Sequence, residues 1–167
     1  MIQLIKGFKD ILPGEVELWQ HIENAAKKIF TNFGFKEIRL PILERAELFA
    51  KSIGENTDIV EKEMYTFPDR KGDLVTMRPE ATASVVRSYI QHKMFGKDPV
   101  RKFYTIGPMF RRERPQKGRY RQFYQINAEV LGVESPMIDA QLIFILKTLF
   151  EELSVPDVKI HINSLGC

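Results

Sequence analysis

Apolar side chains recur every three or four positions in three stretches of the chain, which is the spacing of an amphipathic helix. The first helix is predicted over 15–33, with Gly34 as its stop. The second opens at Pro79 and Glu80, because a missing N–H costs nothing in the first turn and an acid complements the helix dipole. The third runs over 135–153 and is apolar on nearly every side, so we expect it to be deeply buried.

Apolar and polar residues alternate in the remaining segments, as they do in strands. In the segment 37–43, Pro41 cannot donate a ladder hydrogen bond, so that strand is an edge, ends there, or pairs on one side only. The other predicted strands are Met64–Phe67 and Leu74–Met77, joined as a hairpin, the long strands Arg101–Glu113 and Arg121–Gly132, and Val158–Ile162. The order of these elements predicts one α+β domain over residues 1–167, an antiparallel β-sheet flanked by helices.

The strand over 122–130 sorts its side chains by period two into two faces. One face is apolar, and the other carries Phe123, Gln125, Asn127 and Glu129. A solvated strand face shows the same alternation. In the preceding strand, however, Arg111 and Glu113 also share one face. A hairpin that joins the two polar faces would bring them beside Phe123 and Gln125.

Those residue types suit a nucleotide. An arginine grips phosphate oxygens in a bidentate manner, a glutamate accepts from an exocyclic amine, and a phenylalanine offers an apolar plane to a base. The alternative is a surface ion pair between Arg111 and Glu113, of little energetic worth. Spacing alone leaves both interpretations open.

Composition narrows the class of protein, since 44% hydrophobic and 28% charged residues are typical of a globular chain. The net charge of +3 is uneven: six cationic side chains and one acidic one lie between Arg111 and Arg121, and the remainder is slightly acidic. That pattern indicates a local anion site. No apolar run approaches bilayer length, no signal peptide is legible, and Cys167 is the single cysteine, so we expect a cytoplasmic chain without a disulfide. The three histidines are scattered, so no metal site is predicted.

The segment from Phe110 to Phe123 resembles the second signature motif of class II aminoacyl-tRNA synthetases in its histidyl-specific form. The resemblance continues in Gly7–Asp10 with Leu12–Gly14, in the first motif around Ile38–Pro41, and in Thr76–Thr82. It spans essentially the whole chain. The third class motif and the anticodon-binding domain of that family have no counterpart within residues 1–167. The resemblance therefore implies the N-terminal portion of a catalytic domain, which carries an ATP half-site. We expect residues 1–167 alone to be weak or inactive in aminoacylation.

The resemblance also assigns residues to roles. Four would bind ATP: Arg111 at the α-phosphate, as the catalytic residue, Glu113 at the adenine amino group, Phe123 against the adenine ring, and Arg119 near the terminal phosphates. Four would line the histidine pocket, where acceptors suit an ammonium group and an imidazole N–H: Glu80, Thr82, Gln125 and Glu129. An acid at the start of a helix is by itself usually only a dipole complement. Arg114 and Lys117 either form a solvated loop or contact tRNA phosphates.

The implied reaction is ATP-dependent activation of histidine to histidyl-adenylate, followed by transfer to tRNA(His), with Mg²⁺ bridging phosphate oxygens. The first motif usually forms a dimer interface, so a homodimer is expected through the helix over 15–33 and the strand over 38–43. One alternative is a synthetase-like, histidine-binding regulatory subunit of ATP phosphoribosyltransferase, although such subunits generally lack the intact basic loop. Another is a plain RNA-binding module, with steeply salt-dependent RNA affinity and no ATP binding.

Overall fold

The first predicted helix is present in the computed structural model, which describes residues 1–54, 57, 59–96 and 98–163. It is α1 (Val16–Asn32), and it buries Ala25, Ala26, Ile29 and Phe30. The helix ends at Gly34, whose φ of +79° suits a residue without a Cβ, and the Phe35 N–H returns to the Phe30 carbonyl at 2.9 Å. The helix boundary predicted from the sequence is therefore confirmed.

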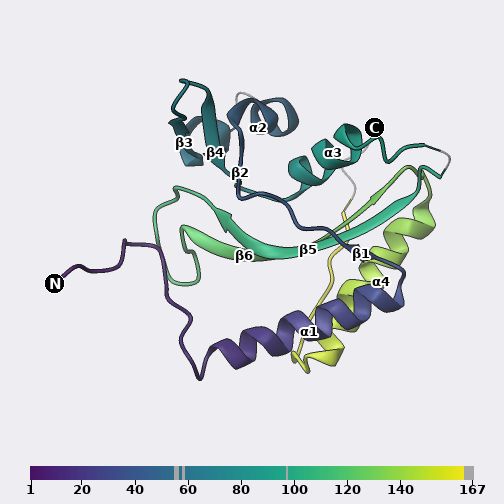
Figure 1. Ribbon diagram of the computed structural model, residues 1–167. Helices are drawn as coiled ribbons and strands as arrows, with labels where there is room; N and C mark the ends of the chain where they lie inside the picture. The colour runs from purple at the N-terminus through teal and green to yellow at the C-terminus, as the bar shows by residue number, and fades with distance from the viewer. Residues whose placement is uncertain (55–56, 58, 97, 164–167) are drawn as a thin grey trace.

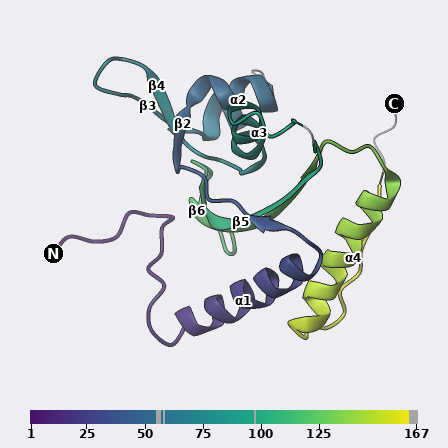
Figure 2. The same ribbon diagram turned by 45° about the vertical axis from the view of Figure 1, so that its right-hand side comes forward.

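A three-stranded sheet lies over α1, in the order β1 (Lys36–Glu37), β5 (Arg101–Phe110) and β6 (Gln122–Leu131). The β5–β6 pair is antiparallel, but β1 runs parallel to β5, so the sheet is mixed and not wholly antiparallel as predicted. One face of the sheet packs on α1 and α4 (Pro136–Glu152), with Tyr104, Ile106 and Ile126 in the shared core. The other face looks toward α3 (Thr82–Gln91), as Figures 1 and 2 show. The α+β class is confirmed.

A second, antiparallel sheet stands beside α2 (Ala46–Ile53) and α3, in the order β2 (Leu43–Arg45), β4 (Leu74–Met77) and β3 (Tyr65–Pro68). The predicted hairpin is thus confirmed as β3 and β4. The hydrophobic core beside this second sheet contains Phe49, Met64 and Ala83. Neither α2 nor the π-helical turn η1 (Ile59–Glu63) was predicted from the sequence.

The predicted strand over 37–43 is wrong as a single element, because the chain leaves the first sheet after β1 and joins the second at β2. Between them, the carbonyls of Leu40 and Pro41 accept from the Arg78 guanidinium instead of from a neighbouring strand. The long strands are also shorter than predicted, at Arg101–Phe110 and Gln122–Leu131. Beyond β5 the Arg112 N–H donates to the Glu63 carbonyl, which diverts the backbone from the ladder.

Two predictions fail toward the C-terminal side. Helix α4 is not deeply buried, since Met137 is 74% and Phe144 55% exposed. Among the described residues it packs on the sheet and α1, and part of it borders a shallow pocket with Val155, Val158 and Ile160. The segment 158–162 is irregular, because no strand in the described ranges pairs with it. A strand needs a partner for its backbone groups, whatever its side-chain pattern.

Candidate active site

The β5–β6 hairpin brings Arg111 and Phe123, two of the predicted ATP-binding residues, together. Met109 pairs with Phe123, and beyond the ladder the Arg111 N–H donates to the Arg121 carbonyl at 2.9 Å, so Arg111 and Phe123 lie on the same face. The Arg111 guanidinium lies 5.1 Å from the centre of the Phe123 ring, within cation–π distance. This is the juxtaposition that the period-two pattern predicted.

Opposite charges hold the start of the basic loop. The Glu113 carboxylate lies 3.9 Å from Arg111 Nη1 through one oxygen and 3.2 Å from Arg119 Nη1 through the other. The Glu113 side chain is 18% accessible while that of Arg119 is 63% accessible, so the arginine can leave this pair at little cost. Arg114 and Lys117 are exposed, which fits both a solvated loop and a loop that contacts phosphates. The arrangement leaves several cationic groups free to meet phosphates.

A second cluster forms where β6 meets the start of α3. The Thr82 hydroxyl donates to Glu129 Oε1 at 2.6 Å, and Asn127 Nδ2 donates to the same oxygen at 3.2 Å. Gln125 lies on the same face of β6, between this cluster and Phe123. Its Oε1 is buried and has no hydrogen-bond partner among the described residues. Gln125, Asn127 and Glu129 therefore form one polar stripe on β6, which begins next to Phe123 and joins the two clusters.

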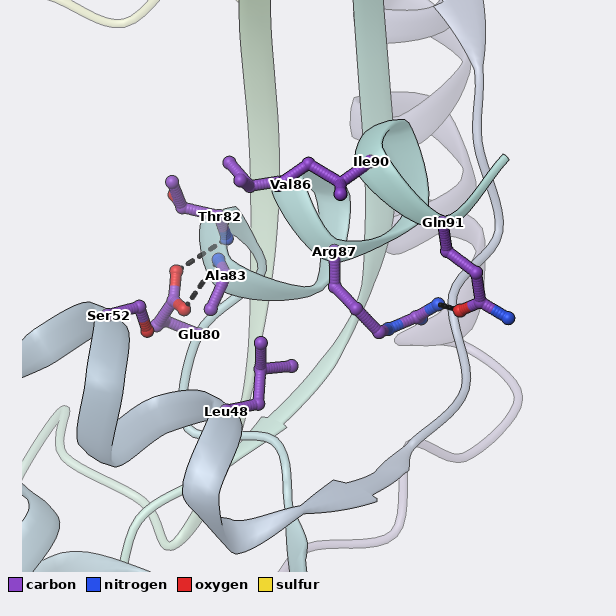
Figure 3. Close-up of a pocket in the computed structure, with 9 residues that line it drawn as sticks. All are labelled: Leu48, Ser52, Glu80, Thr82, Ala83, Val86, Arg87, Ile90 and Gln91. Carbon is purple, nitrogen blue, oxygen red and sulfur yellow. Dashed lines mark hydrogen bonds between the residues drawn. The ribbon is translucent and has the colours of Figure 1, made fainter. Parts of the chain in front are cut away.

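Glu80 has a clear structural task in this cluster. Its two carboxylate oxygens accept the backbone N–H groups of Thr82 and Ala83, the latter at 2.9 Å, so it caps the first turn of α3. This geometry agrees with the dipole-complement interpretation. Glu80 also borders a groove of about 670 Å³ between α2 and α3, shown in Figure 3, whose walls are mainly the apolar side chains of Leu48, Val86 and Ile90.

Sequence reasoning missed Arg78, which is only 4% exposed. Its Nε donates to the Pro108 carbonyl at 3.0 Å and its Nη1 to the Leu40 carbonyl at 2.9 Å. Desolvation by burial lowers the pKa of this guanidinium, and Glu44 partly opposes that shift. The neighbouring Pro79 carbonyl accepts from Arg111 Nε at 3.0 Å, so Arg78 fixes the backbone that orients Arg111. No local pattern in the sequence indicated this role, because the carbonyls that hold the guanidinium lie 30 and 38 residues away in the chain.

The described residues contain no group of three or more His, Cys, Asp or Glu side chains placed to hold a metal ion. They do not fit a dedicated metal cage. Magnesium in ATP sites is usually held by phosphate oxygens, waters and one or two carboxylates. No helix in the described part of the chain is long and apolar enough to cross a membrane.

The fold is that of class II aminoacyl-tRNA synthetase catalytic cores. The family model described as histidyl-tRNA synthetase matches residues 7–166, and the chain belongs to the histidyl-tRNA synthetase family. It is 72% identical over its whole length to the histidine–tRNA ligase of Desulforapulum autotrophicum and 63% identical to that of Geobacter sulfurreducens. The chain spans 39% and 40% of the lengths of those two relatives.

The fold of this chain is similar to that of solved histidyl-tRNA synthetase structures. The apo histidyl-tRNA synthetase of S. aureus aligns over 93% of this chain and 36% of its own, with a TM-score of 0.79 and 39% identity. A structure titled as an ATP phosphoribosyltransferase regulatory subunit/histidyl-tRNA synthetase, from Bacillus halodurans, also has a TM-score of 0.79, over 94% of this chain and 39% of its own. At 18% identity, that likeness concerns the fold alone.

Proposed function

We propose that the protein containing this chain is a histidine–tRNA ligase. It would activate histidine with ATP to give histidyl-adenylate and pyrophosphate, and then transfer the histidyl group to tRNA(His). The observation that carries the proposal is the intact Arg111–Glu113–Phe123 cluster, in a chain 72% identical to a histidine–tRNA ligase. As one domain, residues 1–167 would supply the ATP half-site and part of the histidine pocket.

In this proposal Arg111 is the catalytic residue. The histidine carboxylate attacks the α-phosphorus, pyrophosphate leaves, and negative charge grows on the phosphoryl oxygens. A guanidinium already oriented by the Pro79 carbonyl needs little reorganisation to bind those oxygens. Adenine would stack on Phe123, which requires the guanidinium to leave the ring face for the phosphate. Glu113 would accept from the adenine amino group, and Arg119 would exchange its ion pair with Glu113 for the terminal phosphates.

The histidine pocket would use the second cluster. Glu129 and Gln125 offer acceptors for an ammonium group and an imidazole N–H, and Thr82 fixes Glu129. Glu80 would contribute from the helix cap, with acceptor capacity left beyond its two backbone bonds. Mg²⁺ would enter with ATP, held mainly by the phosphate oxygens.

Two further partners belong to the proposal. Arg114 and Lys117 would contact tRNA phosphates, which their exposure allows. A homodimer would form through α1 and the segment 38–43, where Leu18 is 60% and Ile42 43% exposed. A cytoplasmic location would follow from a role in protein synthesis. The regulatory-subunit alternative has only the fold likeness at 18% identity in its favour, whereas the basic loop is intact here.

The test is ATP–pyrophosphate exchange by the complete protein. We expect exchange that depends on histidine, followed by charging of tRNA(His). Free asparagine or glutamine, supplied as the amino-acid substrate in place of histidine, should support no exchange. A protein that binds histidine but neither exchanges pyrophosphate nor charges tRNA would support the regulatory alternative and overturn the ligase proposal. Salt-dependent RNA binding without ATP binding would favour the RNA-binding module.

A further inference from the structure

Asn127 has no role in the function proposed above, yet it sits in the middle of the polar stripe on β6. Its Nδ2 donates to Glu129 Oε1 at 3.2 Å, and the same oxygen accepts from the Thr82 hydroxyl at 2.6 Å. One carboxylate oxygen is therefore held from two elements at once, β6 and α3. This bracing directs the other oxygen of Glu129 away from both donors.

The other end of the Asn127 amide is buried and unsatisfied. Its Oδ1 has no hydrogen-bond partner among the described residues, and neither has Gln125 Oε1, two positions earlier on the same face. The orientation of the amide follows from chemistry, since the reverse orientation would place Oδ1 against a carboxylate oxygen. Buried acceptors without a partner are costly, so two of them on one face of β6, two residues apart, indicate that N–H groups reach them when the site is filled.

We propose that Asn127 is a specificity-determining residue of the amino-acid pocket. Its Nδ2 positions Glu129, and its Oδ1, on the same face as Gln125 Oε1, is a second acceptor for an N–H group of the bound amino acid. The inference rests on the proposed function, in which that amino acid is histidine, a ligand with N–H groups at both ends. Residues of similar size would not serve: leucine lacks both polar atoms, and aspartate would set a second carboxylate against Glu129.

The first test is steady-state ATP–pyrophosphate exchange by the complete protein carrying Asn127→Ala. We expect the KM for histidine to rise at least tenfold, while the KM for ATP and kcat stay within about twofold, because ATP binds at the other end of the stripe. Gln3→Ala is the matched control, since Gln3 is an exposed amide in the irregular N-terminal segment and should change neither constant. A histidine KM within twofold of the unchanged protein, or an equal rise in the KM for ATP, overturns the inference.

A double-mutant cycle tests whether Asn127 acts through Glu129. With Glu129→Gln already present, Asn127→Ala should raise the histidine KM by a much smaller factor than it does alone. If the fold-increase in the histidine KM of the double variant equals the product of the two single increases, Asn127 acts independently of Glu129. That result would overturn the positioning role. If Asn127→Ala lowers the Tm enough to prevent assay, Asn127→Ser is read against the same criteria.

The proposed function and this inference can fail separately. If the complete protein shows no histidine-dependent exchange, the ligase proposal is wrong. Binding of histidine to the pocket is then measured as the increase in Tm that histidine produces. Asn127→Ala should remove that rise and Gln3→Ala should preserve it; an unchanged rise in the Asn127 variant overturns the inference.

Discussion

Gly107 lies directly against the guanidinium of Arg78: a Cβ built on Gly107 would lie 2.8 Å from Nη2. The guanidinium cannot withdraw without losing its bonds to the carbonyls of Leu40 and Pro108. Gly107 is not among the glycines with positive φ, so its backbone conformation does not by itself require glycine. Glycine is required at this position because the Arg78 guanidinium occupies the space that a Cβ would need.

Gly107→Ala should therefore destabilise the protein. Overpacking a filled site costs about 1–3 kcal/mol, and here the side chain that must yield is a buried cation held by carbonyls. Gly96→Ala is the matched control, because its Cβ would meet only the Lys93 carbonyl, at 3.9 Å. Thermal unfolding of the two variants measures the difference. Equal Tm values would mean that Arg78 adjusts freely and is not the fixed support described here.

Arg111→Lys should nearly abolish histidine-dependent ATP–pyrophosphate exchange although it keeps the positive charge. Lysine cannot donate to the Pro79 carbonyl through Nε and grip two phosphate oxygens at once. Removing one such donor in the transition state lowers kcat by about 10²–10³-fold. Arg70→Lys, in the exposed turn between β3 and β4, should leave kcat unchanged. A kcat for Arg111→Lys within threefold of the unchanged protein would contradict the catalytic role.

The juxtaposition of Arg111 and Phe123 could be predicted from the sequence, because the alternation of side chains along a strand determines which residues share a face. Residues two apart on a strand share a face, and the antiparallel pairing of β5 with β6 then places Arg111 and Phe123 on the same face. The apolar partner face was equally clear, since Ile106 pairs with Ile126 in the core. Local alternation and one connection were sufficient for both.

Contacts between distant segments could not be predicted in this way. Arg78 breaks the expected strand by taking the carbonyl of Leu40, 38 residues earlier in the chain. The exposure of α4 and the irregular course of residues 158–162 depend on which elements lie beside them. The brace between Asn127, Glu129 and Thr82 joins a strand to a helix 47 positions away. No local pattern specifies such a contact.

Variants of Glu80 should separate capping from ligand binding. Glu80→Ala removes the acceptors for the Thr82 and Ala83 N–H groups and should lower the free energy of unfolding by about 0.5–2 kcal/mol. Glu80→Gln keeps one acceptor oxygen and should lose less stability, yet it should raise the histidine KM if the carboxylate meets the ammonium group. Glu134→Ala, in the exposed loop before α4, is the control for both measurements. A histidine KM unchanged in Glu80→Gln would leave Glu80 with the cap alone.

Arg114 and Lys117 should affect tRNA without affecting ATP. Both are exposed in the basic loop, and neither takes part in the Arg111–Glu113–Phe123 cluster. If each neutralises one phosphate of tRNA, replacing either by alanine should reduce the slope of log affinity against log salt by about one. Histidine-dependent pyrophosphate exchange should stay within twofold of the unchanged protein, because it needs no tRNA. Lys51→Ala, exposed on α2, is the matched control for charge, and its salt slope should equal that of the unchanged protein. If the slope for Arg114→Ala and Lys117→Ala matches that of Lys51→Ala, the two side chains belong to a solvated loop, and the tRNA must bind elsewhere.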